Sequence, residues 1–196
     1  MSYHRIQPFN RDKKLRAYII GVALGDGNLS NPNRRAIRLR VTCDRKYPLL
    51  ITHIQSRLAL LLPKNRIGIV NHKNYVDISA YSNHWKTLLW KCGDGPKDKQ
   101  NVSVPQWVRE NKTYAKEALR GLLQTDGSIY QDRNYPMVNF VNTASALSND
   151  VFTMIQSLGY RPNMQRLKQK NGKIKHTIRV SKNVKEFIQE IDLWKK

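Results

Sequence analysis

The chain has 196 residues, of which 35 are Lys or Arg and 14 are Asp or Glu, so its formal charge is +21 at pH 7. Hydrophobic residues make up 40 % of the sequence, which excludes a disordered basic tail and predicts a folded protein with a core of ordinary size. A compact body gains nothing from so much positive charge, because like charges repel one another. The charge therefore indicates a polyanionic partner. We expect nucleic acid, with a general basic scaffold or a membrane-surface binder as the alternative.

The cysteine pattern and the hydropathy exclude two further classes. Cys43 and Cys92 belong to no cluster with metal-ligand spacing, so we expect no zinc site. No apolar run reaches the roughly 18 residues of a membrane span, and the basic N-terminus has no apolar signal segment. We therefore expect an intracellular protein of the cytoplasm, nucleoid or an organelle matrix, which is not secreted and has no membrane partner.

The first predicted element is a helix rich in small residues. Residues 1–13 are polar and basic and are expected to form an arm. Apolar spacing then predicts a helix from Lys14 to Gly25, with Gly27 as a left-handed C-cap. Gly21 and Gly25 lie four residues apart on one face, and each costs about 1 kcal/mol relative to alanine inside a helix. That cost is reasonable if another backbone approaches this face closely.

The rest of the first half alternates strands and helices. Strict alternation predicts a half-buried strand over Ile37–Thr42, and apolar spacing predicts a helix over Pro48–Leu62. Two short strands are expected near Arg66–Val70 and Tyr75–Ala80. Asn83 is expected to cap a closing helix.

A linker divides the chain. Residues 93–104 contain glycines, a proline and lysines, which is the composition of a linker, so we divide the chain into repeats at 1–92 and 105–196. A short helix is expected to begin at Trp107, and Thr113 is expected to cap a second long helix.

The second half repeats the first. Ile19–Gly27 returns 100 residues later as Leu119–Gly127, so Asp26 corresponds to Asp126. We align the strand Ile37–Thr42 with Val138–Thr143 at an offset of 101, as though the preceding hairpin gained one residue, and Val76–Ser79 with Ile178–Ser181 at an offset of 102. This alignment sets Val41 opposite Asn142, an apolar-to-polar change that it leaves unexplained. Each half is α-β-β-α-β-β-α, which predicts an α+β fold of tandem αββαββα repeats with two four-stranded antiparallel sheets.

The two repeated aspartates are expected at the ends of two packed helices. A carboxylate at a helix C-terminus is unfavourable by about 0.3–1 kcal/mol when exposed, and placing Asp26 beside Asp126 adds repulsion between like charges. A divalent cation bound between them reverses both effects, and Mg²⁺ suits hard oxygen ligands. This pattern predicts metal-dependent hydrolysis of phosphodiesters.

The two nonapeptides and the repeats behind them resemble the LAGLIDADG homing endonucleases in their single-chain, two-repeat form. The resemblance covers nearly the whole chain. It implies that the motif helices form the interface between the halves and that the two sheets form a saddle over the DNA major groove. It also implies cleavage of both strands across the minor groove, with 3′ overhangs, in the service of intron homing.

The resemblance also implies a set of site residues. Asp26 and Asp126 would be metal ligands together with the backbone carbonyls of Gly25 and Thr125, with Mg²⁺ as cofactor and Mn²⁺ as a substitute. A catalytic lysine would follow the last helix of a repeat, where Lys97 and Lys99 both fit in the first half. In the second half Lys195 and Lys196 stay open. The chain departs from the usual motif at Gly25, Gln124 and Thr125, and none of these is a metal-binding acid.

Strand alternation predicts the surface that contacts DNA, because a two-stranded ribbon fits the major groove. The predicted outward positions are Arg38, Arg40, Thr42, Tyr75, Asp77 and Ser79 in the first half and Asn139, Thr143, Thr177 and Arg179 in the second. The basic residues expected to contact phosphates from the hairpin tips are Arg34, Arg35, Arg133, Lys168, Lys170 and Lys173. Because the halves expose different residues, we expect a long asymmetric target.

We therefore predict a monomeric, metal-dependent, site-specific endonuclease that acts on double-stranded DNA. One alternative is an RNA-splicing maturase that binds its intron RNA, and the other is a non-catalytic DNA-binding regulator on the same fold. Both acids are present, which argues against the regulator, because a protein that only binds gains nothing from two repelling carboxylates. It argues only weakly against the maturase.

Overall fold

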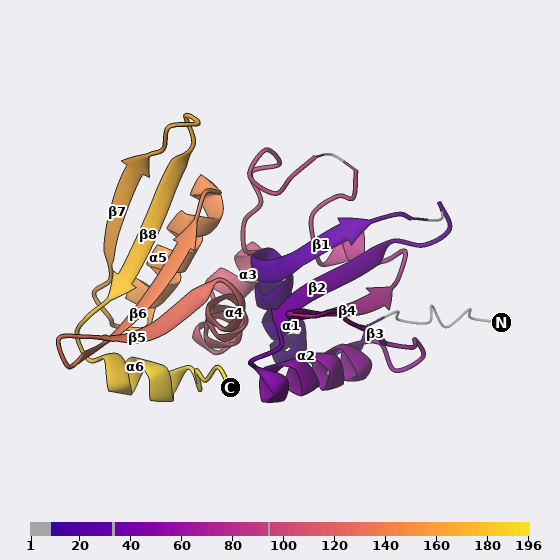
Figure 1. Cartoon of the computed structure of the whole chain (residues 1–196), viewed down its shortest axis with the longest axis horizontal. Coiled ribbons are helices and arrows are strands. Elements are labelled where there is room, and N and C mark those ends of the chain that lie inside the picture. Colours follow the sequence, from indigo (N-terminus) through magenta and orange to yellow (C-terminus); the bar gives the residue numbers. More distant parts are fainter. Residues whose placement is uncertain (1–8, 33, 94) are drawn as a thin grey trace.

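The structure is a computed structural model that describes residues 9–32, 34–93 and 95–196. Two sheets stand on either side of a central pair of helices (Figure 1). The first half contains α1 (Lys13–Asp26), β1 (Gly27–Ser30), β2 (Arg38–Asp44), α2 (Pro48–Leu61), β3 (Gly68–Asn71), β4 (Tyr75–Tyr81) and a single 3₁₀ turn, η1 (Trp85–Thr87). The predicted arm at residues 1–13 falls largely outside the described residues.

The second half repeats this order after a short additional helix. Its elements are α3 (Gln106–Arg109), α4 (Lys112–Thr125), β5 (Gly127–Asp132), β6 (Tyr135–Asn142), α5 (Ser145–Ser157), β7 (Asn163–Lys168), β8 (Ile174–Val180) and α6 (Val184–Glu190). The strand orders are β1-β2-β4-β3 and β5-β6-β8-β7, and every pairing is antiparallel. The predicted α+β fold with two four-stranded sheets is confirmed.

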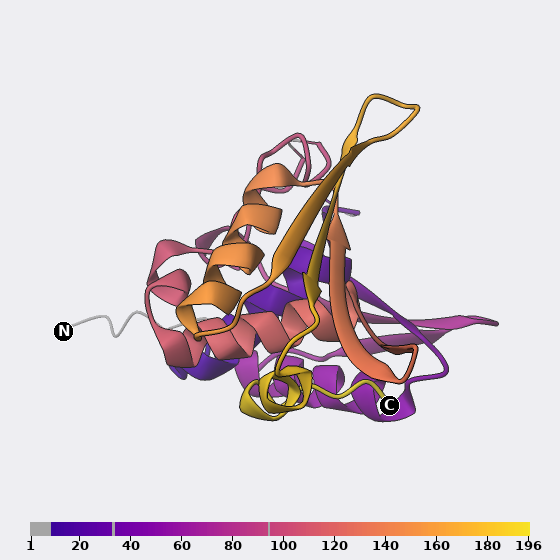
Figure 2. The same cartoon turned by 90° about the vertical axis from the view of Figure 1, so that its left-hand side faces the viewer.

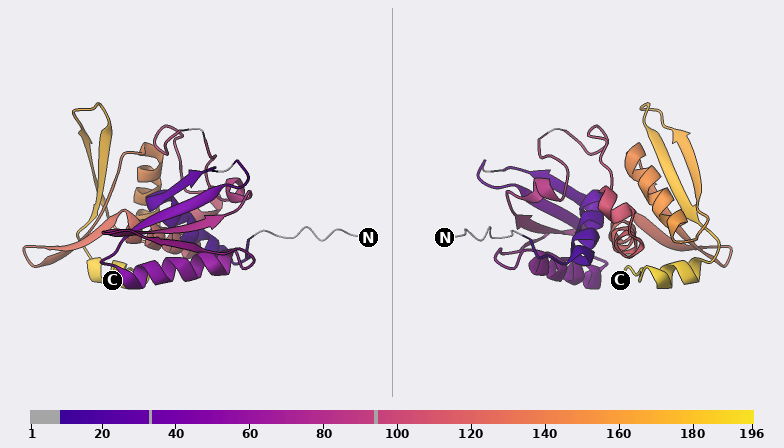
Figure 3. Two further views of the ribbon diagram at one scale, coloured as in Figure 1. Left: turned by 45° about the vertical axis from the view of Figure 1, so that its right-hand side comes forward. Right: turned by 180° about the vertical axis from the view of Figure 1, so that it is seen from behind.

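The motif helices α1 and α4 pack side by side in the middle of the molecule, as the view from behind shows (Figure 3). A Cβ atom on Gly21 would lie 2.2 Å from the carbonyl oxygen of Ala118. A Cβ atom on Gly121 would lie 2.5 Å from the carbonyl oxygen of Tyr18. Any larger residue would have to push the helices apart, so the predicted close backbone approach is confirmed.

Each repeat has its own hydrophobic core, and α1 contributes to both. Tyr18, Ile19 and Val22 pack in the first core, whereas Ile20 and Leu24 pack in the second. Because α1 is buried on almost every side, its sequence is apolar all round instead of amphipathic. The helix pair is therefore shared by the two repeats and fixes how they meet.

Several predicted helix ends are wrong. Gly27 is not a left-handed cap, since its φ of −77° and ψ of 144° are extended and it begins β1. A glycine is still needed there, because a Cβ atom would lie 2.4 Å from the carbonyl oxygen of Ala23. Thr113 does not cap α4. Asn111 does, by accepting hydrogen bonds from the amides of Thr113 and Tyr114.

The predicted closing helix of the first half is also wrong. Only the 3₁₀ turn η1 forms there, and Asn83 does not cap it. The Asn83 side chain instead accepts from the amide of Ile37 and donates to the carbonyl of Arg35. Asn83 thereby holds the long β1–β2 connection against the end of β4.

The strand register corrects the alignment of the two repeats. Gly27 pairs with Val41 in the first sheet, whereas Gly127 pairs with Phe140 in the second. The second hairpin is therefore one residue shorter, and the offsets of 101 and 102 are wrong. Val41 corresponds to Phe140, which removes the apolar-to-polar mismatch. Asn142 corresponds instead to Cys43. Each of them lies two residues after the matched residue, Val41 or Phe140, and on the same face of its strand.

The sheets extend beyond the helical body. Seen from the side, the β7–β8 hairpin projects well past the helices (Figure 2). The β5–β6 hairpin closes through a two-residue turn at Arg133 and Asn134, which both have positive φ. This is the geometry of a tight hairpin. Among residues 9–32, 34–93 and 95–196, no helix combines the length and the hydrophobicity that a bilayer crossing requires.

Candidate active site

The two motif aspartates meet where α1 and α4 end. The carboxyl groups of Asp26 and Asp126 lie close enough that each shifts the pKa of the other. The predicted meeting of the two acids is therefore confirmed, and either a retained proton or a bound cation would relieve the repulsion between them.

Burial makes both acids hard to ionise, and the charge of Asp26 adds to this effect at Asp126. Burial raises the pKa of Asp26, although this residue is the more exposed of the two. Burial and then the charge of Asp26 raise the pKa of Asp126 to about 6, while nearby Lys97 and Asn142 oppose that rise. Without a bound cation, Asp126 therefore keeps its proton up to a pH of about 6.

One lysine lies at the end of each motif helix. The Nζ atom of Lys97 donates to the carbonyl oxygen of Leu24 at 2.8 Å and also to that of Gly25. The Nζ atom of Lys195 donates to the carbonyl oxygens of Thr125 and Gly127, at 2.9 and 3.0 Å. Each ammonium group therefore offsets the partial negative charge at a helix C-terminus.

These two lysines also interact with the acids. Burial lowers the pKa of Lys97 and of Lys195, and the charges of Asp26 and Asp126 partly restore both. The sequence left the second lysine open between Lys195 and Lys196, and the structure brings Lys195 to the acids. Of the two candidates in the first half, only Lys97 lies there.

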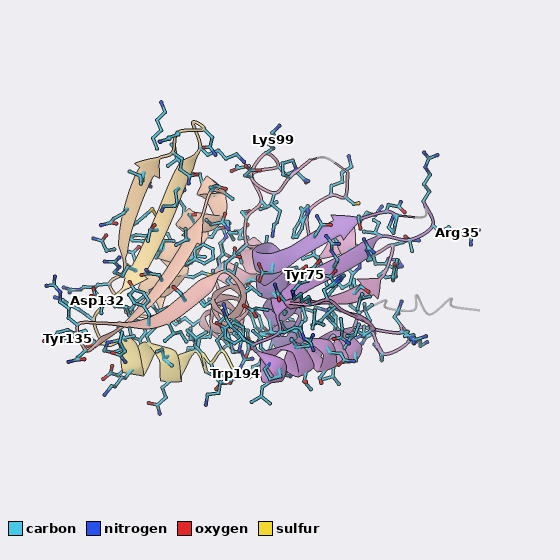
Figure 4. All side chains as sticks on the ribbon, in the orientation of Figure 1. Arg35, Tyr75, Lys99, Asp132, Tyr135 and Trp194 are labelled. Atoms are coloured by element: carbon cyan, nitrogen blue, oxygen red, sulfur yellow. The ribbon has the colours of Figure 1, made fainter. Side chains whose placement is uncertain are left out.

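Lys99 lies outside the candidate site, so the structure does not bring this predicted catalytic residue to the acids. The residue is exposed, its amide donates to the side chain of Asp98, and it lies on the outer part of the linker (Figure 4). The linker turns back after Pro96, which directs Lys97 inward and leaves Lys99 in solvent.

The aspartate of each repeat faces the C-terminal end of the other repeat's motif helix. A Cβ atom on Gly25 would lie 2.0 Å from Thr125 Oγ1 and 3.6 Å from Asp126 Cγ, so the end of α1 lies against the second acid. A cavity of about 190 Å³ is lined by Asp26, Thr125 and Lys195. Each acid therefore lies next to the end of the other repeat's helix.

We name two centres from this arrangement. The first centre comprises Asp26, Cys43, the Thr125 carbonyl and Lys195. The second centre comprises Asp126, Asn142, the Gly25 carbonyl and Lys97.

The two centres differ at one matched position. Asn142 Nδ2 donates to Asp126 Oδ2 at 2.9 Å, and Asn142 Oδ1 accepts from the amide of Ala144. The first centre has Cys43 at this position, and burial and the charge of Asp26 raise the pKa of its thiol to about 12. Sequence reasoning missed Asn142 because the assumed register was wrong. Matching Val41 to Phe140 by apolar character would have revealed it.

The donors present fit an ion that needs few protein ligands. In the described part of the chain, no group of three or more His, Cys, Asp and Glu side chains could hold a metal ion. Asp26 and Asp126 would supply the carboxylates, and the carbonyls of Gly25 and Thr125 each keep a second lone pair beside their lysine. Mg²⁺ keeps several waters and takes phosphate oxygens, so it fits this sparse set, whereas zinc does not.

The outward face of the first sheet carries a polar cluster around Asp77. Thr42 Oγ1 donates to Asp77 Oδ1 at 2.6 Å, and Arg40 lies 3.9 Å from the same carboxylate. His72 contacts Asp77 at 3.2 Å and stacks on Tyr75. The other two predicted positions of this half, Arg38 and Ser79, lie on the same half-buried face.

The second sheet carries a different outward cluster. Arg179 Nε donates to Asn139 Oδ1 at 3.2 Å, and Asn139 Nδ2 donates to the hydroxyl of Tyr130 at 3.0 Å. Thr177 lies on the same face. Thr143 does not, because β6 ends at Asn142 and Val141 takes the outward position. The prediction for Thr143 as an outward strand residue is therefore wrong.

The predicted phosphate-contacting residues lie on the hairpin connections. Arg35 and Tyr135 mark opposite ends of the molecule (Figure 4). The exposed residues of this set are Arg34 and Arg35 after β1, Arg133 after β5, and Lys168, Lys170 and Lys173 around the β7–β8 tip. Lys173 pairs with Asp98 of the linker at 2.6 Å. Their roles in DNA binding stay predictions.

Comparisons with known proteins agree with this fold. The family model described as a LAGLIDADG-like domain matches residues 113–192, and the WhiA LAGLIDADG-like domain matches residues 15–79. The chain thus carries two LAGLIDADG-like repeats in a single polypeptide. No match to it is found among curated proteins.

Solved structures share the arrangement over nearly the whole chain. The homing endonuclease I-DmoI in complex with DNA and Mn has a TM-score of 0.65 at 18 % identity, covering 92 % of this chain and 95 % of that one. The N-terminal LAGLIDADG domain of DUF199/WhiA has a TM-score of 0.62 at 13 % identity, with coverage of 96 % and 88 %. Full-length DUF199/WhiA from Thermatoga maritima has a TM-score of 0.63 at 11 % identity, with coverage of 96 % and 58 %. At these identities the matches establish the fold and leave the activity open.

Proposed function

We propose that the protein is a site-specific homing endonuclease that hydrolyses both strands of an asymmetric DNA target. The observation that carries the proposal is the close approach of Asp26 to Asp126, with a half-buried lysine beside each helix end. This arrangement costs stability in the free protein, and binding a cation is what makes it useful.

DNA as the substrate is supported by charge and by fold. The formal charge of +21 suits a polyphosphate partner. The outward sheet faces carry Arg38, Arg40 and Arg179, and arginine is the most common reader of guanine in the major groove. I-DmoI, which shares the fold, is described in complex with DNA and with Mn, Ca or Mg.

The residues divide the chemistry among themselves. Asp26, Asp126 and the carbonyls of Gly25 and Thr125 would hold the ion. A bound divalent cation such as Mg²⁺ supplies an activated water and neutralises charge at the scissile phosphate. Lys97 and Lys195 place ammonium groups where charge develops on the phosphate oxygens.

The remaining contacts orient these groups. Asn142 holds Asp126 by a direct hydrogen bond, which limits the rotation of that carboxylate. With one centre for each DNA strand, cleavage across the minor groove leaves 3′ overhangs.

The test is a cleavage assay on the DNA that flanks the coding frame, rejoined without the insertion. We expect Mg²⁺ or Mn²⁺ to support cutting and excess chelator to stop it. Asp26→Asn and Asp126→Asn should each abolish double-strand cleavage and leave DNA affinity within a few-fold. Undiminished cutting by either variant would remove that aspartate from the catalytic role.

A non-catalytic DNA-binding protein is the second candidate. The WhiA LAGLIDADG-like domain matches the first repeat, including its motif helix. For such a protein the same assay would give sequence-specific binding with no cutting at any metal concentration. Tight binding to intron RNA in place of the DNA duplex would indicate a maturase.

A further inference from the structure

The segment after α6 follows a fixed path along its own repeat. We call residues 191–196 the strap. Asp192 pairs with Arg120 at 2.8 Å, and the carbonyl of Trp194 accepts from Gln124 Nε2 at 3.1 Å. Gln124 is fully buried, and its Oε1 accepts from the hydroxyl of Tyr18 on α1 at 2.8 Å. The polar contacts of the strap therefore reach the seam between the motif helices.

The strap then crosses to the first repeat. The ring of Trp194 packs on the first core and meets the ring of His53 edge-on at a centroid distance of 5.2 Å. The amide of Leu50, near the start of α2, donates to the carbonyl of Lys196 at 3.0 Å. Figure 4 shows Trp194 between α6 and α2. The strap is thus held by both repeats.

The His53 contact is apolar in character. Burial, reinforced by the charges of Arg57 and Arg120, lowers the pKa of His53 to about 4. The imidazole is therefore neutral at pH 7, and its other side contacts Tyr18 at 5.3 Å. Trp194, His53 and Tyr18 thus make two successive edge-on ring contacts, and removal of Trp194 breaks the one that joins the strap to the first repeat.

Lys195 lies between the two docked residues of the strap. Its Nζ reaches the carbonyls of Thr125 and Gly127 and lies 5.3 Å from the centre of the Tyr47 ring. It lines the same cavity as Asp26. Lys97 reaches the second centre by another route, from the linker, where its Nζ lies 5.3 Å from the Trp90 ring. Only the first centre therefore depends on the strap for its lysine.

We propose that Trp194 is a positioning residue for the first centre: it docks the strap of the second repeat onto the first repeat and so holds Lys195 beside Asp26. This inference rests on the proposed nuclease function for its catalytic consequence. The docking itself does not depend on that function. Loss of Trp194 slows the strand cut by the first centre and spares the other strand, which a general loss of stability would not do.

The test compares nicking of the two strands by the full chain. We expect Trp194→Ala to slow one strand by about 10-fold to 100-fold, since a misplaced catalytic group costs that much, with the other strand within about two-fold. Lys195→Met should slow the same strand, Lys97→Met should slow the opposite strand, and Trp194→Phe should restore most of the rate. Equal slowing of both strands, or no slowing, would overturn the proposal.

A matched control separates docking from stability. Trp107 is a half-exposed tryptophan of α3 that meets Tyr114 of α4 edge-on. Trp107→Ala removes a similar side chain, and we expect it to leave the ratio of the two nicking rates unchanged. A changed ratio in this variant would remove the specificity claimed for Trp194.

A second readout needs no cleavage and so distinguishes the two proposals. In Trp194→Ala we expect faster hydrogen exchange at the Leu50 amide and faster acylation of Lys195 by an amine-reactive reagent. The acylation rate of Lys97 should stay unchanged. Trp107→Ala should change neither. If the protein binds DNA without cutting it, this readout still tests whether Trp194 docks the strap onto the first repeat. Unchanged exchange and acylation in Trp194→Ala would overturn the docking role.

Discussion

At the residue scale, the molecule keeps two carboxyl groups closer together than local stability favours. Asp26 and Asp126 could be predicted from the sequence, because the repeat sets them at one offset and each ends an apolar helix. Asn142 could not, since its place depends on the length of a hairpin. Lys195 could not either, because the path of the strap is set by tertiary contacts at Trp194.

The pair should destabilise the metal-free protein as pH rises. The pKa of Asp126 is raised from 3.8 to about 6 on folding, so the folded state binds this proton more tightly than the unfolded state. The stabilisation is present below pH 4 and is lost as pH rises to about 6. In chelator at pH 7.5, Asp126→Asn should therefore be more stable than the parent by roughly 1–2 kcal/mol.

Thermal unfolding at pH 4 and pH 7.5 checks this. The stability advantage of Asp126→Asn over the parent should shrink at pH 4, and Mg²⁺ should stabilise the parent more than Asp126→Asn. Asp132→Asn, at an exposed hairpin position, is the matched control and should change little at either pH. A parent that is more stable than Asp126→Asn in chelator at pH 7.5 would contradict the repulsion.

Asn142 should matter for chemistry more than for affinity. Asn142→Ala removes the hydrogen bond to Asp126, so we expect nicking by the second centre to fall by about 10-fold, as for a misoriented catalytic group. Asn139 lies on the same strand with its side chain on the outward face. Asn139→Ala should instead weaken target binding. Single-turnover nicking and equilibrium binding of both variants decide between these roles.

At the element scale, long periodic elements were predictable and short or locally decided ones were not. The helices α1, α2 and α4 and the strands β2 and β4 follow hydrophobic spacing, within a few residues at their ends. The closing helix of the first half failed, because the chain after β4 makes only a single 3₁₀ turn. The repeat offsets failed because hairpin length changes register without changing composition.

The glycine contact between α1 and α4 gives a direct prediction at this scale. Gly21→Ala places a methyl group 2.2 Å from the carbonyl oxygen of Ala118, which the helices can relieve only by separating. We expect a loss of about 1–3 kcal/mol or more in the free energy of unfolding. Denaturant titration measures it. Lys116→Ala on the outer face of α4 loses only a surface ion pair with Glu190 and should cost less than about 1 kcal/mol.

At the scale of the whole molecule, the net charge and the arrangement of the two sheets both favour a DNA partner. The helix pair fixes two sheets whose outward faces carry different polar clusters, around Asp77 in one and Asn139 in the other. The sequence alone predicted the two-fold arrangement and the excess charge. It did not predict that Asp77 would form an ion pair with Arg40 or that Asn139 would accept a hydrogen bond from Arg179.

The hairpin-tip cations should control the salt dependence of binding. Arg34 and Arg35 are exposed, and replacing both with alanine removes up to two ion pairs with phosphates. We expect affinity to fall for all sequences alike, and the slope of log affinity against log salt to decrease by about 0.9 for each phosphate that is no longer neutralised. Titrations at several salt concentrations measure this. A change in target preference without a change in slope would assign these residues to base reading instead.

The proposed function requires the acid pair to be a cation site, and titration with Mn²⁺ followed by electron paramagnetic resonance is the sharpest test of that requirement. The parent protein and the double variant Asp26→Asn/Asp126→Asn are compared, each free and on duplex DNA. We predict that the parent binds Mn²⁺ in excess of the DNA alone and that the double variant loses this binding. Equal Mn²⁺ binding by the two proteins would contradict a cation site at Asp26 and Asp126.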